Sequence, residues 1–248
     1  MMLRNRLQRD GQWLFAQRGY LPVVILLPAF AVLLRNGYPM GGPERYGAWL
    51  AVCTILALAG QIVRLVTIAH VPSHTSGRNR KEQVAGSLNT EGSYSMVRNP
   101  LYFGNCLSWL GLAAIPCSLP LWALVAVVFW AYHERVIYTE ESFLEGKFGN
   151  AFRNWAERTP AFFPNPTLWR PPSFGYSWRY ALGREFEGFF LVAQAIAVLD
   201  TLVRSAAERR FTYQPGIAAA ALAMAIAFIA VRWARKKTQL FRVEGRSW

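Results

Sequence analysis

The chain has few cysteines and few acidic residues. Its 248 residues include only three cysteines (Cys53, Cys106 and Cys117), and none forms a Cys-x-x-Cys pair. This spacing argues against a disulfide framework or a cysteine-based metal site, and we expect no metal site and three small buried side chains. Asp and Glu number 14 against 27 Lys and Arg, which gives a formal net charge of +13.

Long apolar runs accompany this charge, and a soluble basic protein of this size would not contain them. Hydrophobic residues make up 53% of the chain. A transmembrane helix needs roughly 20 mostly apolar residues to cross a ~30 Å hydrocarbon core. We therefore expect an all-α, polytopic integral membrane protein with about six transmembrane helices, at residues 20–36, 46–68, 101–115, 119–138, 187–204 and 214–234. The third run is short for a complete crossing.

Lys and Arg gather in the N-terminal segment, the 70–100 loop, the 135–186 region and the C-terminal tail. With six spans, all four regions fall on one side, which the positive-inside rule assigns to the cytoplasm. Both termini are therefore expected to be cytoplasmic in a multi-pass protein, with a bacterial inner membrane as the expected location. Arg204, Arg209 and Arg210 break the pattern. The basic charge favours anionic lipid as a partner, and no recognisable soluble fold suggests nucleic acid.

The spans and loops suggest three parts: 1–44 with the first span, a core over 45–170, and a C-terminal helical hairpin with a basic tail over 171–248. In the second span, Arg64 is expected to snorkel to the interface. Gly104, Ser108 and Gly111 share one helix face and predict close helix contact. Residues 148–180 combine aromatics, arginines and prolines, which favours a segment at headgroup depth.

Two polar stretches stand out beside the third and fourth spans. Pro100 predicts a helix start whose free N–H groups favour an anion, and Arg98 adds a positive charge. On the helix that continues from the fourth span, Glu140 and Glu141 point about 100° apart, so one can face a ligand while the other pairs with a cation. A ligand with an anionic group, a ribose and a positive centre fits this arrangement. Alternatively, Arg98 and one glutamate simply form an interfacial ion pair.

The residues Gly92-x-Tyr94-x-x-x-Arg98-Asn99-Pro100-x-Tyr102-x-Gly104 resemble the Gly-x-Tyr-x-x-x-Arg-His-Pro-x-Tyr-x-Gly motif of the isoprenylcysteine carboxyl methyltransferase and phospholipid methyltransferase family. Arg135, Glu140-Glu141 and Leu144, followed by Phe148-Gly149, resemble its second block. The resemblance covers roughly residues 45–170.

This resemblance implies S-adenosylmethionine (SAM) bound at a cytoplasmic-side pocket, and a lipid or lipid-linked acceptor that enters from the bilayer. The implied cofactor-binding residues are Arg98, Asn99, Pro100, Tyr102, Gly104, Glu140 and Glu141. The implied catalytic residues are Arg135 and Asn99, and the implied acceptor-binding residues are Arg135, Tyr138 and His133.

Asn99 departs from the family pattern, which has histidine at this position. Asparagine can form hydrogen bonds but cannot take up a proton near neutral pH, so an acceptor that needs no deprotonation, a phosphate or carboxylate, is favoured. The alternative is a chain that has lost activity and serves as a membrane scaffold. Sterol reductases that use NADPH share a similar Arg-His-Pro turn, which leaves a reductase as a further alternative.

Overall fold

The structure, a computed structural model, describes residues 38–72 and 85–243, and every regular element in these two ranges is helical. The α-helices are α3 (Pro43–Ala69), α4 (Ser93–Met96), α5 (Pro100–Ala114), α6 (Leu119–Phe148), α7 (Asn150–Ala156), α8 (Trp178–Glu208) and α9 (Pro215–Lys237). Two short 3₁₀ helices, η1 (Pro39–Gly41) and η2 (Pro166–Leu168), complete the described elements. The predicted all-α class is confirmed for this part of the chain.

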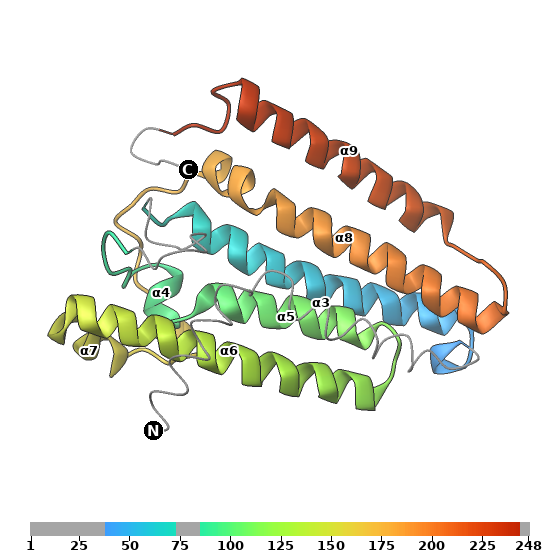
Figure 1. Ribbon diagram of the computed structural model, residues 1–248, viewed down its shortest axis with the longest axis horizontal. Coiled ribbons are helices and arrows are strands. Elements are labelled where there is room, and N and C mark those ends of the chain that lie inside the picture. The colour runs from blue at the N-terminus through green and yellow to red at the C-terminus, as the bar shows by residue number, and fades with distance from the viewer. Residues whose placement is uncertain (1–37, 73–84, 244–248) are drawn as a thin grey trace.

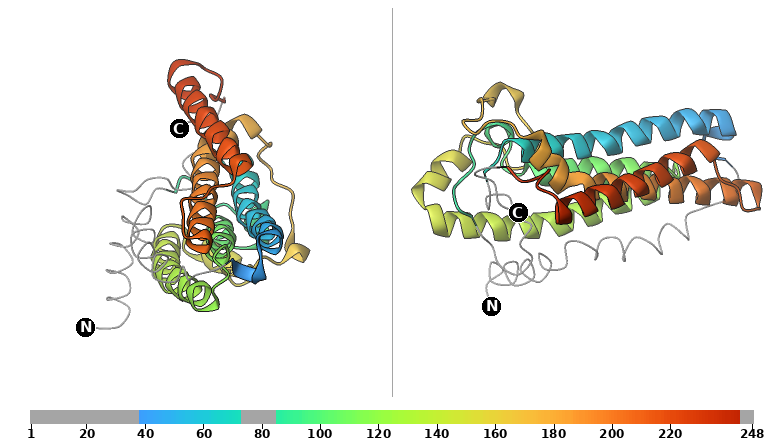
Figure 2. Two further views of the ribbon diagram at one scale, coloured as in Figure 1. Left: turned by 90° about the vertical axis from the view of Figure 1, so that its right-hand side faces the viewer. Right: turned by 90° about the horizontal axis from the view of Figure 1, so that it is seen from above.

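Five long helices lie side by side in the order α9, α8, α3, α5, α6 (Figures 1 and 2). The short helices α4 and α7 gather at one end of this layer, where α5 begins and α6 ends (Figure 1). Successive helices run in opposite directions, so α3 ends, α5 begins, α6 ends and α8 begins at that same end. We refer to it as the motif end, because it carries residues 92–105 and 140–149.

Glycine governs the contact between α3 and α5. A Cβ placed on Gly104 would lie 2.7 Å from the Gly60 carbonyl oxygen and 2.8 Å from Cγ of Arg64. A Cβ on Gly111 would lie 2.6 Å from the Ala57 amide nitrogen. The Ser108 hydroxyl lies between these two contacts and donates to the Ala57 carbonyl at 2.9 Å. The predicted small-residue face is therefore confirmed as a helix contact.

The α8 helix packs its apolar face along α3. Val192, Ile196, Leu199 and Val203 of α8 form a buried core with residues of α3 that include Tyr46 and Leu50. These four positions recur every three or four residues, as expected for one face of an α-helix. Cys53 belongs to this core as predicted, whereas Cys106 is half-buried and Cys117 is exposed, so the expectation of three buried cysteines is wrong for Cys117.

The described helices coincide with five of the six predicted spans, and the first, 20–36, lies outside the described residues. Among the helices of residues 38–72 and 85–243, three are long and apolar enough to cross a membrane by length and composition: α3, α8 and α9. The α5 helix has only 15 residues, in keeping with the short third run. Membrane association therefore follows from the helices, whereas the six-span count remains a prediction.

Arg204, which broke the predicted charge pattern, is paired within its own helix. Its Nε lies 2.8 Å from one Asp200 carboxylate oxygen and 3.0 Å from the other. The guanidinium also lies over the Tyr46 ring, 5.3 Å from the centroid. The ion pair is buried and lies at the opposite end of the bundle from the motif end. Asp200 therefore offsets the positive charge of Arg204 within the predicted fifth span.

Candidate functional site

The α5 helix begins as its sequence predicts. Pro100 occupies the first helical turn, where its missing N–H costs no hydrogen bond, and Asn99 is the N-cap with φ −123° and ψ 58°. The Asn99 side chain makes no capping hydrogen bond to the helix. Its amide group is thereby available to hydrogen-bond groups outside α5.

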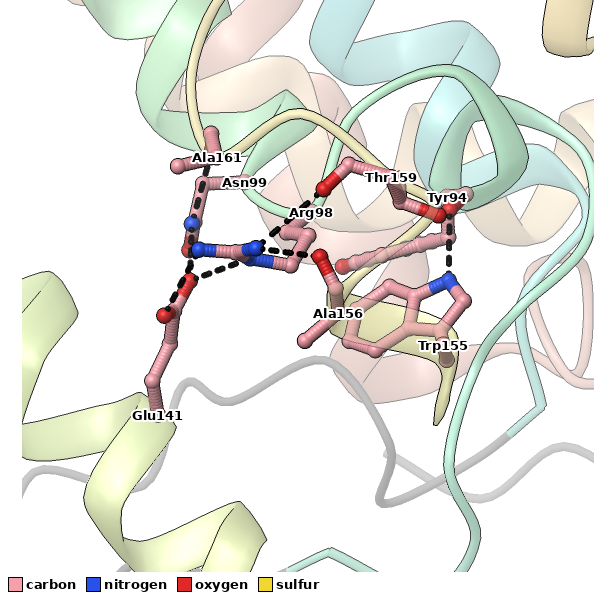
Figure 3. A network of polar contacts seen from close by, with 8 residues as sticks. All are labelled: Tyr94, Arg98, Asn99, Glu141, Trp155, Ala156, Thr159 and Ala161. Carbon is pink, nitrogen blue, oxygen red and sulfur yellow. Dashed lines mark hydrogen bonds and ion pairs between the residues drawn. The ribbon is translucent and has the colours of Figure 1, made fainter. Parts of the chain in front are cut away.

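Arg98 joins three segments of the motif end (Figure 3). Its Nε and Nη2 atoms donate to the two carboxylate oxygens of Glu141 on α6, at 2.9 and 3.1 Å. Its Nη1 donates to the backbone carbonyls of Ala156 and Thr159, at 2.7 and 3.2 Å. A forked Arg–carboxylate pair combines charge with fixed geometry. The interfacial ion pair that the sequence left as an alternative is therefore present, and its partner is Glu141.

Asn99 adds to the same group, which we call the Arg98–Asn99–Glu141 clasp. The Asn99 Nδ2 donates both to Glu141, at 3.0 Å, and to the Ala161 carbonyl, at 2.9 Å (Figure 3). Asn99 is buried. An amide nitrogen carries two N–H donors, and both are used here, whereas one neutral imidazole nitrogen could supply only one.

Glu140 faces a different neighbour. The Tyr102 hydroxyl of α5 donates to its carboxylate at 2.8 Å. The Tyr102 ring also contacts the edge of the His133 ring, with centroids 5.3 Å apart. His133 is buried, stacks on Phe129, and has Nδ1 2.9 Å from the Phe129 carbonyl. Glu140 and His133 thus lie on the face of α6 that meets Tyr102 of α5.

Arg135 and Tyr138 do not join this group. Five residues of α-helix correspond to about 500°, so Arg135 points about 140° away from Glu140. The Arg135 guanidinium hydrogen-bonds the Ala131 carbonyl one turn back on its own helix. The helical period also places Arg135 about 160° and Tyr138 about 140° from His133 around α6. The binding of an acceptor by these three residues remains a prediction.

The turn before Arg98 is held by the segment that follows α7. The Gly92 amide donates to the Arg170 carbonyl at 2.9 Å, and the Arg98 amide donates to the Pro160 carbonyl at 2.8 Å. Gly92 has φ +58°, and a Cβ there would collide with the His70 ring. The His70 Nε2 accepts from the Ser93 amide at 3.1 Å. These contacts explain why the motif begins with glycine.

Tyr94 of α4 contacts α7 and an apolar cluster of α3 and α8. Its backbone carbonyl accepts from the Trp155 indole at 3.2 Å (Figure 3), and its ring packs near Ile68 and Tyr180. Burial of the phenol raises the pKa of Tyr94, and the nearby Glu140 carboxylate raises it further, while Arg184 and Arg64 act in the opposite direction. Tyr94 therefore stays protonated, as a hydrogen-bond donor, at physiological pH.

Arg64, which we expected to snorkel to the interface, pairs with side chains of α8 and α5. Its Nε and Nη2 atoms both lie 2.8 Å from Oε2 of Glu185 on α8, and its Nη1 donates to Asn105 of α5 at 2.8 Å. Glu185 is only 2% exposed. Sequence reasoning missed Glu185 as the partner of Arg64. Arg64 itself could have indicated such a partner, because an arginine inside a predicted membrane span needs an opposite charge nearby.

Gly104 and Pro100 are accounted for by helix packing and helix initiation, and their implied contacts with a cofactor remain predictions. Among the residues that the structure describes, no three His, Cys, Asp or Glu side chains gather into a group that could hold a metal ion.

Comparison with known proteins gives one family. Residues 48–151, from α3 to the start of α7, match the family described as phospholipid methyltransferase. Protein-S-isoprenylcysteine O-methyltransferase B of Arabidopsis thaliana is 30% identical over 113 residues, which cover 44% of this chain and 56% of that protein.

Two bacterial relatives carry other names. The cobalt-zinc-cadmium resistance protein CzcN of Cupriavidus metallidurans is 38% identical over 130 residues, covering 51% of this chain and 56% of that protein. The nickel-cobalt-cadmium resistance protein NccN of Alcaligenes xylosoxydans xylosoxydans is 40% identical over 100 residues, covering 40% and 44%. The chain thus spans about half the length of these relatives. No solved structure matches it significantly.

Proposed function

We propose, on the premise that residues 48–151 belong to the phospholipid methyltransferase family, that the protein is an integral membrane methyltransferase that uses SAM and modifies a lipid or lipid-linked acceptor. One observation carries the proposal. Within the matched segment, the Arg98-Asn99-Pro100 start of α5 meets the Glu140-Glu141 pair of α6. These are the two blocks on which the family resemblance depends.

The residues at the motif end fit such a cofactor. Glu140 supplies a carboxylate for an amine or hydroxyl groups, and the first N–H groups of α5 favour an anion. Tyr102 orients Glu140 through its 2.8 Å hydrogen bond. SAM, when bound, would supply an electrophilic methyl group on a sulfonium, so the protein needs to position the acceptor and exclude water.

We assign different roles to the two glutamates. Glu141 is committed to Arg98 and Asn99, so its role is to hold α5, α6 and the 156–161 segment together. Glu140 is the glutamate we place in contact with the cofactor. Arg98 and Asn99 then act as positioning residues of the clasp, because all the described hydrogen bonds of their side chains go to Glu141 and to backbone carbonyls.

The acceptor that fits best carries its own negative charge. No group in the clasp offers a proton-accepting imidazole, since Asn99 takes the place of the family histidine. A phosphate or carboxylate oxygen can attack a methyl group without losing a proton first. We therefore propose a lipid phosphate or lipid-linked carboxylate as the acceptor.

The same proposal includes a topology. Six spans, with both termini and the motif end in the cytoplasm of a bacterial inner membrane, agree with the basic residues at that end and with the three apolar helices. The methyltransferase core would comprise 45–170, with 1–44 and 171–248 as additional parts.

Methyl transfer is the direct test. Membranes containing the protein would be incubated with SAM carrying a radioactive methyl group, and lipids would then be extracted and separated. We expect label in a lipid fraction with wild type and none with Glu140→Ala. A lipid product heavier by one methylene, found by mass spectrometry, would identify the acceptor. Equal labelling with wild type, Glu140→Ala and empty membranes would refute the proposal.

A further inference from the structure

Arg64 of α3 lies at a junction of three helices. Its Nε and Nη2 atoms both lie 2.8 Å from Oε2 of Glu185 on α8, and its Nη1 donates to Oδ1 of Asn105 on α5 at 2.8 Å. The stem of Arg64 crosses the Gly104 position of α5, where a Cβ would lie 2.8 Å from its Cγ. Arg64 therefore contacts the first two turns of the helix that begins at Pro100.

Stability does not account for an ion pair in this place. The Arg64 and Glu185 side chains are 19% and 2% exposed, and Arg64 lies within a predicted membrane span. Moving two charges out of water costs about as much free energy as their attraction contributes, so an apolar pair of similar volume would hold the helices together as well. A guanidinium instead supplies directed hydrogen bonds in a fixed plane. The pair is therefore suited to fixing the orientation of the neighbouring helices.

The orientation that Arg64 fixes is the rotation of α5 about its own axis. Asn105 and Leu101 are four residues apart and share the face of α5 that meets α3. Apolar contacts such as those of Leu101 have no preferred direction, whereas the Arg64–Asn105 hydrogen bond has one. Tyr102 lies one turn before Asn105 and about 60° around the helix, and its hydroxyl donates to Glu140 at 2.8 Å. A rotation of α5 would move this hydroxyl away from Glu140.

We propose that Arg64 is a positioning residue of the candidate site. It acts through Asn105 and Tyr102 to hold Glu140 in the orientation that binds the cofactor. The inference rests on the proposed function. It extends the framework of the site to α8, which lies outside the segment matched by the family and supplies the carboxylate that pairs with Arg64. The C-terminal part of the chain thereby contributes to ligand binding.

Asn105→Leu tests this role, because it removes the oxygen that accepts from Arg64 and keeps the Arg64–Glu185 ion pair. Asn105→Ala is a second variant without that oxygen, for the case that leucine is not accommodated, and Asn105→Asp restores an accepting oxygen. Gln194→Leu is the matched control, because its half-buried amide also joins two helices, by donating to the Ala221 carbonyl of α9 at 2.9 Å. Each purified protein would be titrated with S-adenosylhomocysteine by calorimetry, and its melting temperature in detergent would report folding.

Asn105→Leu and Asn105→Ala should each weaken S-adenosylhomocysteine binding about tenfold, whereas Asn105→Asp and Gln194→Leu should bind it as wild type does. Tyr102→Phe, which removes the hydrogen bond to Glu140, should weaken binding to a similar extent. Combining Tyr102→Phe with Asn105→Leu should weaken it little further, because both act on the same carboxylate, whereas independent effects would multiply to about a hundredfold. A residue with a merely structural role would lower the melting temperature without this coupling.

Wild-type binding by both Asn105→Leu and Asn105→Ala, or losses that multiply in the double variant, would overturn the positioning role while leaving the proposed function intact. Equal weakening by Gln194→Leu or by Asn105→Asp would also overturn it. Failure of the wild-type protein to bind S-adenosylhomocysteine would instead refute the proposed function, and with it this inference.

Discussion

The different roles of Glu141 and Glu140 can be separated with two matched substitutions on adjacent residues. Glu141 accepts three hydrogen bonds, two from Arg98 and one from Asn99. Hydrogen bonds to charged groups contribute about 1.5–3 kcal/mol each when buried. Because the Arg98 and Glu141 side chains are 18% and 22% exposed, solvent screening reduces this value. We expect Glu141→Gln to lower the free energy of unfolding by about 2 kcal/mol.

Glu140→Gln should behave in the opposite way. Glu140 accepts one hydrogen bond from Tyr102, and a glutamine oxygen can still accept it. The stability loss should stay below about 1 kcal/mol. Binding of S-adenosylhomocysteine should fall sharply, because the negative charge is gone while the fold is intact.

Thermal unfolding in detergent and calorimetric titration of the same samples measure the two effects. A double substitution, Arg98→Gln with Glu141→Gln, should cost less than the sum of the two single losses, because the residues are in contact. The assignment of roles is refuted if Glu140→Gln destabilises the protein as much as Glu141→Gln, or if Glu141→Gln leaves the melting temperature unchanged.

Three further predictions concern packing, acidity and the motif asparagine. Gly60→Ala should prevent stable packing of α3 on α5, because the added Cβ would collide with α5. Gly47→Ala, on the same helix, is the control, because a Cβ there meets nothing within 4 Å. The fraction of each variant that is folded after solubilisation measures the difference. The Ser173 hydrogen bonds lower the pKa of Glu91, so their stabilisation is present above the ordinary carboxyl pKa of about 4.3 and is lost as pH falls through the lower folded value. Glu91→Gln should therefore lower the melting temperature at pH 7 but not at pH 3, and equal effects at both would contradict this reasoning. In Asn99→His, the free energy of unfolding should fall as pH rises above about 6.5. The reason is that the imidazole can donate to both Glu141 and Ala161 only when it is protonated. A free energy of unfolding that does not change with pH in this variant would count against the observed clasp.

The sequence predicted the local structure of the motif end well. Pro100 begins α5, and Gly104 and Gly111 make the close contact with α3. Adjacent helical residues point about 100° apart, and Glu141 accordingly pairs with Arg98 while Glu140 accepts a hydrogen bond from Tyr102. These features follow from proline geometry, side-chain size and helical period, all of which act over a few residues.

Long-range partners were not predictable in the same way. Which glutamate pairs with Arg98 depends on the rotation of α6 relative to α5, and the Arg64–Glu185 pair joins residues 121 positions apart. Apolar periodicity sets which face of a helix is buried but not which helix covers it. The position of Arg135 was within reach of sequence reasoning, since helical period alone places it about 140° from Glu140.

Direct binding tests the central claim most simply. Purified wild-type protein in detergent would be titrated with S-adenosylhomocysteine by calorimetry, with NADPH as the comparison ligand. We predict saturable binding at one site, a dissociation constant that changes little between pH 6 and pH 8, sharply weaker binding by Glu140→Gln, and no heat from NADPH. Absence of S-adenosylhomocysteine binding, or saturable binding of NADPH in its place, would contradict a methyltransferase site at the motif end.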